Sequence, residues 1–327
     1  MSIEKCLRKF LPWASAMALC LAASQSAWAA YPERVIKLIV PFAPGAGTDI
    51  ATRMIVPALE RELGAKLVLE NRSGAGGDIG NEFASKAAPD GYTIVVNSSN
   101  LLLAPLLRKE AKYSLDADFA PIARFATAQM VMVASPTRLT ARNILELVDY
   151  SKKSGSKLNF GSAGAGAPPD LLAEILRLRT GLNYEPIAYR GMAPALADLL
   201  GGSIDFTHPS MLAVKQHIET GKMRAIAVTG SQRMGIAPTV PTFAESGIDV
   251  SPMANGTWWG LFAPAGTPEA IIATLSQAIN RAVSDPETRK KLEEGGYGAA
   301  YLAPPEFAAE LRQEVNTWKA LTPQFKK

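Results

Sequence analysis

Two glycine-rich turns in this chain of 327 residues have the residue types that bind anions through the backbone. The first turn follows an apolar run, precedes a helical pattern, and contains the candidate residues Phe42, Pro44, Gly45, Ala46, Gly47, Thr48 and Asp49. At a strand–turn–helix junction, the unpaired N–H groups of the first helical turn and the positive end of the helix dipole face the same spot. We therefore expect a carboxylate or phosphate site here, although a tight connection without a ligand has the same sequence pattern.

The second turn repeats this pattern in the second half of the chain. Its candidate residues are Ser162, Gly164, Ala165, Gly166 and Ala167, and a helical pattern follows them. The hydroxyl group of Ser162 adds a side-chain donor to the backbone donors. Two such helix starts that approach from opposite sides would bind both ends of a small dianion, or one carboxylate from two sides. The alternative is a flexible loop.

Two polar residues elsewhere complete the predicted ligand-binding set. Tyr189 ends a strand pattern directly before Arg190, whose guanidinium could pair with a ligand carboxylate or form an ordinary ion pair. Asp205 lies near the start of another strand pattern, where its carboxylate would accept a ligand N–H or O–H, or else fix the local backbone. In the late strand that begins with Trp258 and Trp259, the alternation of side chains puts one ring in the core and leaves the other for the crevice.

The sequence lacks the residue patterns that enzymes and metalloproteins need. The serine of the second turn lacks the glycine two positions before it that a nucleophile elbow requires. His208 and His217, the only histidines, are nine positions apart, which is not a familiar metal-binding spacing. A third glycine cluster at residues 74–80 fails the dinucleotide-binding spacing, because Ile79 stands where the third glycine belongs. We therefore predict no catalytic residue, no cofactor and no metal ion.

The N-terminus has the pattern of a secretory signal peptide. Lys5, Arg8 and Lys9 precede a short apolar run, and residues 27–29 fit the small-x-small cleavage rule. We therefore predict that residues 1–29 are removed near Ala29 on export. Both cysteines of the chain lie within this segment, which excludes disulfides and thiolate sites from the mature protein.

The charge of the mature chain argues against a nucleic-acid partner. Removal of the predicted signal lowers the formal net charge from +4 to +2, since the signal carries three basic residues and one acidic residue. Lysine and arginine form no run or stripe in the sequence. The mature chain also has no long uninterrupted apolar stretch, so we expect a soluble monomer.

Strand and helix patterns alternate along almost the whole chain, which is typical of an α/β fold with parallel sheets. In the first half, a buried strand over Val35–Phe42 leads to a helix over Asp49–Leu63. In the second half, a strand over Lys157–Gly161 leads to a helix over Asp170–Thr180. These two cycles predict two α/β lobes with a crevice between them. Ligands bind beyond the carboxyl ends of the strands in such sheets, so we expect the two glycine-rich turns to face each other.

Several stretches together resemble the Bug (TctC-like) family, the periplasmic solute receptors of tripartite tricarboxylate transporters. They keep their order over most of the mature chain and include Ile39-Val-Pro-Phe-Ala-Pro44, Val68-Leu-Glu-Asn-Arg72, Gly74-Ala-Gly-Gly-Asp-Ile-Gly80, Pro89-Asp-Gly-Tyr92 and Asp198-Leu-Leu-Gly-Gly-Ser-Ile-Asp205. The resemblance implies two domains that close over a small organic acid like a Venus flytrap, with membrane transporter subunits as partners. It also implies that main-chain N–H groups and bridging waters of Phe42–Asp49 and Ser162–Ala167 hold the carboxylate.

Three departures from the family pattern concern the ligand. Ala46 and Ala167 stand where the family usually has glycine and serine, and Asp170 replaces a common histidine directly after Pro168 and Pro169. The second turn therefore has fewer donors and an added negative charge. This favours a monocarboxylate with an apolar or aromatic body over a citrate-like trianion.

The sequence thus predicts a periplasmic receptor that captures a small carboxylate and passes it to a membrane transporter, without catalysis. We expect one lobe to consist of residues 30–126 and 251–327, and the other lobe to consist of residues 127–250. A sensory receptor that feeds a membrane signalling protein would have the same sequence features. A secreted enzyme acting on an organic acid would need a nucleophile–base pair, which the sequence does not offer.

Overall fold

The computed structural model describes residues 31–107, 111–153, 155, 157–162, 167–189 and 192–325. The predicted signal peptide and its cleavage site near Ala29 lie outside these residues. The chain divides into two compact units, Met1–Glu33 and Arg34–Lys327. All the helices and strands described below belong to the second unit.

A six-stranded mixed sheet forms the first lobe. Its strand order is β11-β4-β10-β3-β1-β2, and its strands are β1 (Ile36–Val40), β2 (Leu67–Asn71), β3 (Thr93–Asn97), β4 (Phe119–Ala128), β10 (Thr257–Pro264) and β11 (Gly298–Leu302). β1 pairs in parallel with β2 and β3, whereas β10 runs antiparallel to β3 and β4, and β11 antiparallel to β4. β1 is almost entirely apolar because it is central and both faces of the sheet are covered.

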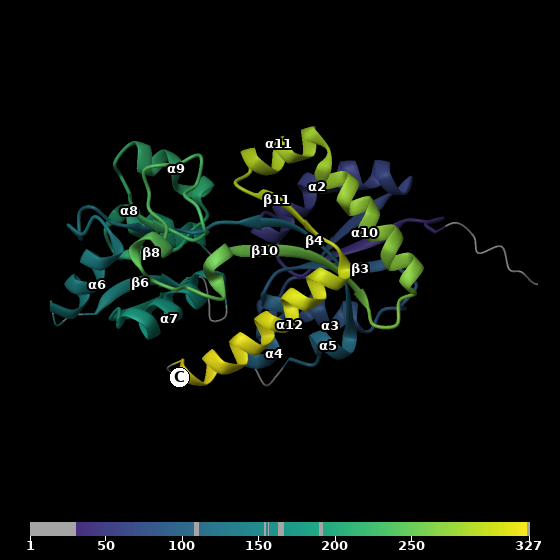
Figure 1. Ribbon diagram of the computed structural model, residues 1–327, viewed down its shortest axis with the longest axis horizontal. Helices are drawn as coiled ribbons and strands as arrows, with labels where there is room; N and C mark the ends of the chain where they lie inside the picture. Colours follow the sequence, from purple (N-terminus) through teal and green to yellow (C-terminus); the bar gives the residue numbers. More distant parts are fainter. Residues whose placement is uncertain are drawn as a thin grey trace, which may run out of the picture. The chain divides into compact units, whose positions relative to one another are not determined.

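Helices cover both faces of this sheet (Figure 1). One face carries α2 (Gly47–Leu63), α10 (Glu269–Ser284) and α11 (Pro286–Glu294), and the other carries α3 (Asp78–Ser85), α4 (Asn100–Leu107) and α12 (Pro304–Leu321). A short helix α5 (Leu115–Asp118) precedes β4. α2 ends at Gly64, whose left-handed backbone (φ 63°) closes the helix as glycine commonly does.

A five-stranded sheet forms the second lobe, in the order β7-β6-β8-β5-β9. Its strands and helices are β5 (Val131–Ala134), α6 (Ile144–Lys153), β6 (Leu158–Ser162), α7 (Pro168–Thr180), β7 (Tyr184–Ala188), α8 (Met192–Gly201), β8 (Phe206–Thr207), α9 (Met211–Glu219) and β9 (Arg224–Val228). Side chains of β5 alternate between the two faces. Val131 and Val133 pack in one cluster with residues of α8 and α9, whereas Met132 and Ala134 belong to the main core.

The chain crosses between the sheets twice, and the two crossing segments lie side by side. β4 leads to β5 through Gln129 and Met130, and the return path enters β10 through Gly256. Met130 N–H donates to Thr229 Oγ1 at 2.9 Å, and Gln129 Nε2 donates to the Thr229 carbonyl at 2.7 Å. A Cβ at Gly256 (φ 79°) would lie 2.1 Å from the Ala128 carbonyl oxygen, so only glycine fits this crossing.

The two-lobed α/β fold predicted from the sequence is confirmed, but the expectation of parallel sheets is wrong. Each sheet has parallel strands at its βα units and antiparallel strands where the chain crosses. β5 and β10 each enter their sheet from a crossing and not through the helical connection that makes strands parallel, and each runs antiparallel to both of its neighbours. The sequence analysis also assigned no element to residues 98–118. α4 occupies part of this range, and its eight residues are mostly apolar, which leaves little contrast between faces.

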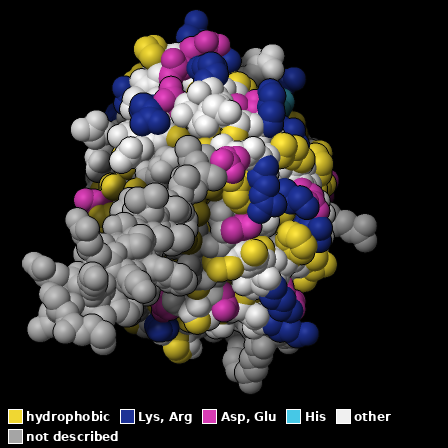
Figure 2. All heavy atoms as spheres, turned by 90° about the vertical axis from the view of Figure 1, so that its right-hand side faces the viewer, with side chains coloured by type: hydrophobic (Ala, Val, Ile, Leu, Met, Phe, Trp, Pro, Cys, Tyr) yellow, Lys and Arg dark blue, Asp and Glu magenta, His cyan; other side chains and the backbone are white. Residues whose placement is uncertain are grey.

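The surface of the protein mixes charges of both signs. Figure 2 shows one face of the molecule, on which basic and acidic side chains are interspersed. Within the described part of the chain, every helix is too short or too polar to cross a membrane.

One carboxyl group lies inside the core of the first lobe. Glu314 on α12 is 9% exposed, and its carboxylate oxygens accept hydrogen bonds from the indole N–H groups of Trp258 at 2.7 Å and Trp318 at 3.1 Å. Burial raises the pKa of Glu314 to about 7, although the two indole hydrogen bonds oppose this shift. The group therefore changes its charge near neutral pH.

We predict that Glu314 makes the protein less stable as the pH rises. Because its pKa in the folded state exceeds the usual value, its favourable contribution is complete below pH ~4.5 and is lost as the pH rises through about 7. From pH 5 to pH 8, the free energy of unfolding should decrease more in the wild type than in Glu314→Gln. The expected difference between the two decreases is on the order of 1–3 kcal/mol. Urea unfolding at both pH values measures this difference. Glu306→Gln, an exposed position on the same helix, should follow the wild type. Equal pH slopes for the wild type and Glu314→Gln would contradict the prediction.

Candidate ligand-binding site

A cavity of about 590 Å³ is lined by elements of both lobes. The first lobe contributes the start of α2, the first residues of β10 and residues 295–297 before β11. The second lobe contributes the start of α7, the first two turns of α8 and residues 208–210 before α9. The crossing residues 128–130 also belong to the wall. The site therefore lies where the two sheets meet, beyond the carboxyl ends of β1, β3 and β8.

The described part of the cavity wall is apolar and uncharged. It consists of proline, alanine, methionine, leucine and aromatic side chains, together with a few hydroxyl, amide and imidazole groups. No aspartate, glutamate, lysine or arginine is among the described residues that line it. A carboxylate in this cavity would therefore meet hydrogen-bond donors rather than an opposite charge on those residues.

The start of α2 supplies such donors. The N–H groups of Gly47, Thr48 and Asp49 have no acceptor within the described part of the chain, because helical bonding begins with the N–H of Ile50. Ala46 is the N-cap residue, and it has no side-chain oxygen with which to cap the helix. Gly47 and Thr48 line the cavity. The positive end of α2 is thus left open towards the cavity, as expected for an anion site.

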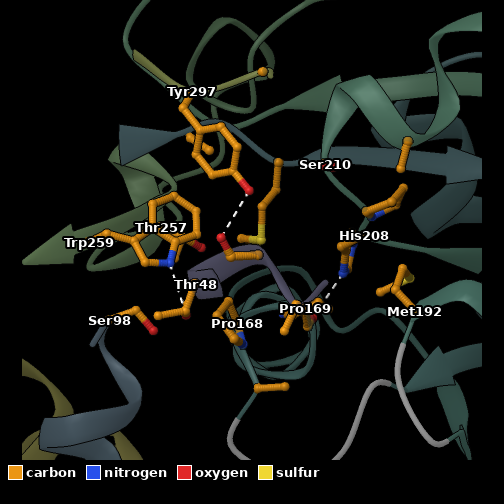
Figure 3. Close-up of a pocket in the computed structure, with 18 of the residues that line it drawn as sticks. Thr48, Ser98, Pro168, Pro169, Met192, His208, Ser210, Thr257, Trp259 and Tyr297 are labelled. Atoms are coloured by element: carbon orange, nitrogen blue, oxygen red, sulfur yellow. Dashed lines mark hydrogen bonds between the residues drawn. The ribbon is translucent and has the colours of Figure 1, made fainter. Parts of the chain in front are cut away.

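Two aromatic residues of the first lobe hold this helix start in place (Figure 3). The Tyr297 hydroxyl donates to the Gly47 carbonyl at 3.0 Å, and Trp259 Nε1 donates to Thr48 Oγ1 at 3.1 Å. The two rings pack edge to face with their centroids 5.0 Å apart. Since Thr48 Oγ1 already accepts from Trp259, its own hydroxyl hydrogen can be donated to a ligand.

Asp49 fastens the first turn from the side away from the cavity. Its Oδ2 accepts from Gly45 N–H and Arg53 Nε, each at 2.9 Å, and its Oδ1 accepts from Asn71 Nδ2 at 2.9 Å. Asn71 Nδ2 also donates to the Phe42 carbonyl at 3.0 Å. Burial acts to raise the pKa of Asp49, but the bonds from Arg53, Gly45 and Asn71 outweigh it and leave the pKa below its ordinary value. Asp49 is therefore ionised at neutral pH.

The start of α7 differs from the start of α2. Pro168 and Pro169 are its first two residues and have no N–H group. The N–H groups of Asp170 and Leu171 both donate to the Ala167 carbonyl, at 3.0 and 3.1 Å. The start of α7 thus presents two pyrrolidine rings to the cavity, and none of its first four helical residues has a free N–H group. Gly164, Ala165 and Gly166 lie outside the described residues, so ligand binding by their N–H groups stays a prediction.

The structure brings together some of the predicted site residues and separates others. Phe42, Ala46, Gly47, Thr48 and Ala167 line the cavity, whereas Pro44, Gly45, Asp49, Ser162, Tyr189 and Asp205 do not.

Besides Gly45 and Asp49, three of the residues outside the cavity wall have internal hydrogen-bond partners. The Ser162 hydroxyl donates to Asp170, and the Tyr189 hydroxyl donates to Asp198 at 2.6 Å. Asp205 accepts from Arg138 Nε at 2.6 Å and from the Asn159 N–H at 2.7 Å. Direct ligand contacts by Ser162, Tyr189 and Asp205 remain untested predictions. Arg190 lies outside the described residues.

His208 is a cavity residue that the sequence analysis considered only as a metal ligand. Its ring is buried between Phe160 and Phe206, with centroids 5.4 and 5.7 Å away, and its Nδ1 is 3.0 Å from the Pro169 carbonyl oxygen. Burial lowers the pKa of His208 to about 4, so the imidazole is neutral at physiological pH. Because a carbonyl oxygen can only accept, Nδ1 carries the hydrogen. Nε2 therefore bears a lone pair, and no described residue is its hydrogen-bond partner.

The sequence also matches a known protein family. The family model described as "Tripartite tricarboxylate transporter family receptor" matches residues 51–326. The chain belongs to this receptor family. The resemblance to Bug (TctC-like) proteins is thereby confirmed, and the receptors of this family are periplasmic binding proteins for solutes.

Individual relatives of this receptor agree with that assignment. The protein BugT of Bordetella pertussis is 34% identical over 290 residues, which cover 88% of each chain. The solved structure of MatC from Rhodopseudomonas palustris with bound malate is 29% identical, with a TM-score of 0.77, and the match covers 89% of this chain and 99% of MatC. The structure of R. palustris Rpa4515 with adipate is 27% identical, with a TM-score of 0.79, and the match covers 90% and 97% of the two chains.

We predict that Asp49→Asn destabilises the receptor without changing the cavity wall. The asparagine amide would keep the volume but would turn its NH₂ group towards donors, leaving at least one of them unpaired. The free energy of unfolding at pH 7 should fall by roughly 1–3 kcal/mol, as measured by denaturant unfolding.

The pH dependence provides a second check on Asp49. The lowered pKa of this carboxyl adds stability above the ordinary value of ~3.9, and this contribution is lost as the pH falls through the folded-state pKa. The wild type and Asp49→Asn should thus converge in strong acid. Asp149→Asn, at a position whose side chain is 67% exposed, serves as the control. A variant as stable as the wild type at pH 7 would show that Asp49 does not hold the turn.

Proposed function

We propose that this receptor captures a small organic carboxylate at the start of α2 and delivers it to a membrane transporter of the tripartite tricarboxylate type. The observation that carries the proposal is the set of free N–H groups of Gly47, Thr48 and Asp49 beside a cavity with an uncharged described wall. In such a wall, backbone dipoles are strong donors because little water competes with them. Bound malate in MatC and bound adipate in Rpa4515 support a carboxylate as ligand.

Binding would act through closure of the two lobes. The lobes consist, in our proposal, of residues 30–126 with 251–327, and of residues 127–250. A ligand that contacts the start of α2 and the wall of the second lobe at the same time stabilises the closed form, because those contacts exist together only in that form. The crossing segments at residues 128–131 and 254–257 would serve as the hinge. Capture and release need no chemical step, so we assign no catalytic residue.

The cellular setting of the proposal follows from the N-terminal sequence and the family. Cleavage near Ala29 would release the mature receptor into the periplasm, where it meets the ligand. The membrane subunits of the transporter would then accept the ligand from the closed receptor.

The asymmetry of the two helix starts favours a monocarboxylate. α2 offers free donors, whereas the start of α7 offers Pro168 and Pro169, and the nearby carboxylate of Asp170 adds a negative charge to that side. A second carboxylate on the ligand would thus find no helix start to bind in the second lobe. Met192, Leu196 and the two proline rings instead suit an apolar or aromatic body.

The variant Gly47→Pro tests whether the N–H groups of α2 hold the carboxylate. Proline is favourable at the first position of a helix, and it removes only the N–H group. Ala46 already has the backbone geometry (φ −68°, ψ 157°) that Ala167 has before Pro168 (φ −70°, ψ 148°). We expect the variant to fold and to bind carboxylates at least about ten-fold more weakly, since a hydrogen bond to a charged group contributes ~1.5–3 kcal/mol. Tryptophan fluorescence titration measures the affinities.

Gly47→Ala is the matched control, because it keeps the N–H group. Its Cβ would lie 3.6 Å from Trp259 Cζ2 and 3.7 Å from the Tyr297 hydroxyl, which are ordinary contacts. A thermal-shift screen of mono-, di- and tricarboxylates against the mature protein first identifies the ligand for this titration. A ligand at a hundred times its Kd raises the free energy of unfolding by about 2.7 kcal/mol. Equal affinities of Gly47→Pro and Gly47→Ala would refute the site, and a screen without any carboxylate hit would refute the proposed function.

A further inference from the structure

The second-lobe side of the cavity contains an acceptor that no described residue of the protein satisfies. His208 is fully buried, lines the cavity, and has a neutral ring whose Nε2 lone pair lacks a partner. An unpaired polar atom in an apolar setting is costly, so a donor is expected to reach it during the working cycle of the protein.

The described neighbours of His208 cannot be that donor. Pro168, Pro169 and Pro209 have no N–H group, and the rings of Phe160 and Phe206 have no polar hydrogen. The nearby thioether of Met192 can only accept, and the one recorded bond to it comes from the Thr207 hydroxyl. We therefore look for the donor in the contents of the cavity. Figure 3 shows His208 at the wall beside Met192, with its Nδ1 bond directed to Pro169.

We propose that the ligand carries an uncharged hydroxyl group at the end remote from its carboxylate, and that His208 Nε2 accepts the hydrogen bond of this hydroxyl. This inference rests on the proposed function, because it takes the carboxylate to bind at the start of α2. The ligand class is then a hydroxy-monocarboxylic acid with an apolar or aromatic body between the two groups. His208 is the specificity-determining residue of the second lobe.

The chemistry of Nε2 excludes the other common end groups. An ionised second carboxylate has only acceptor oxygens and would face the lone pair of Nε2 without a hydrogen between them. A plain methyl or phenyl end leaves Nε2 unpaired. An ammonium group would be buried beside Phe160, Phe206 and three prolines with no carboxylate in the described wall to offset its charge. A hydroxyl satisfies the acceptor at the lowest desolvation cost.

Matched ligand pairs test this inference on the mature protein. Each pair consists of a monocarboxylic acid and the same acid with a hydroxyl at the far end. One series of pairs has straight chains, and the other consists of benzoates or phenylalkanoates. The dicarboxylate of equal length is measured with each pair. In at least one series, the hydroxylated acid should bind at least ten-fold more tightly than the plain acid, and the dicarboxylate no more tightly than the plain acid. Calorimetric titration gives the affinities.

The variant His208→Asn removes the acceptor and preserves the contact with Pro169. The asparagine amide nitrogen takes the position of Nδ1 and can still donate to the Pro169 carbonyl, while nothing remains at the position of Nε2. The ratio of the two affinities in a pair should fall to about two-fold or less. His217→Asn, which changes the only other histidine and lies outside the cavity wall, should keep the full ratio.

A direct spectroscopic measurement covers the case in which His208→Asn fails to fold. With only two histidines in the chain, the imidazole nitrogens of labelled wild-type protein can be assigned through His217→Asn. The Nε2 resonance of His208 should shift on addition of the hydroxylated acid and should stay in place with the plain acid.

The outcomes separate this inference from the proposed function. Equal binding of plain and hydroxylated acids, or tighter binding of the dicarboxylate, overturns the role of His208 and leaves the carboxylate receptor intact. A preference that survives in His208→Asn also overturns it. Failure of every acid to bind overturns the proposed function and this inference with it.

Discussion

The open start of α2 is the constraint on which the rest of the site depends. A helix that begins without a side-chain cap leaves three N–H groups unpaired, and in an apolar cavity this is costly. The protein maintains this arrangement through side chains: the Asp49 carboxylate accepts from the Gly45 N–H within the turn, and Tyr297 and Trp259 hydrogen-bond to the helix start. The donors are thus held in position before any ligand arrives, so little ordering is left for the binding step.

Local sequence patterns were sufficient to predict the βα units but not the way the lobes connect. Ile36–Val40 and Gly47–Leu63 follow from a run of apolar residues, a glycine turn and helical periodicity, all within thirty residues. The reversed direction of β5 and β10 could not be predicted in this way. Each enters its sheet from a crossing, and the crossing into β5 at Gln129 and Met130 is held by residues about a hundred positions away in the sequence.

The separation in sequence between interacting residues also explains which site residues could be predicted. Phe42, Ala46, Gly47 and Thr48, which line the cavity, were predictable because a strand, a glycine-rich turn and a helix start follow one another within a few residues. Tyr297 and Trp259 were not, since they reach α2 from 250 and 211 positions along the chain. The role proposed for His208 depends on the burial of its ring and on an Nε2 atom without a partner among the described residues. No pattern of residue types encodes either property. The sequence did contain Pro168 and Pro169, but their effect appears only when the helix is seen to begin at the first of them.

The paired prolines at the start of α7 separate selectivity from folding. A proline in the first turn removes N–H donors that a helix does not use for its own hydrogen bonds. A residue change there therefore alters what the cavity can bind without destabilising the helix. Evolution could therefore exchange an anion-binding helix start for an apolar one by few substitutions and at little thermodynamic expense. A scaffold with this property can diversify its ligands rapidly, because new specificities need not pass through poorly folded intermediates.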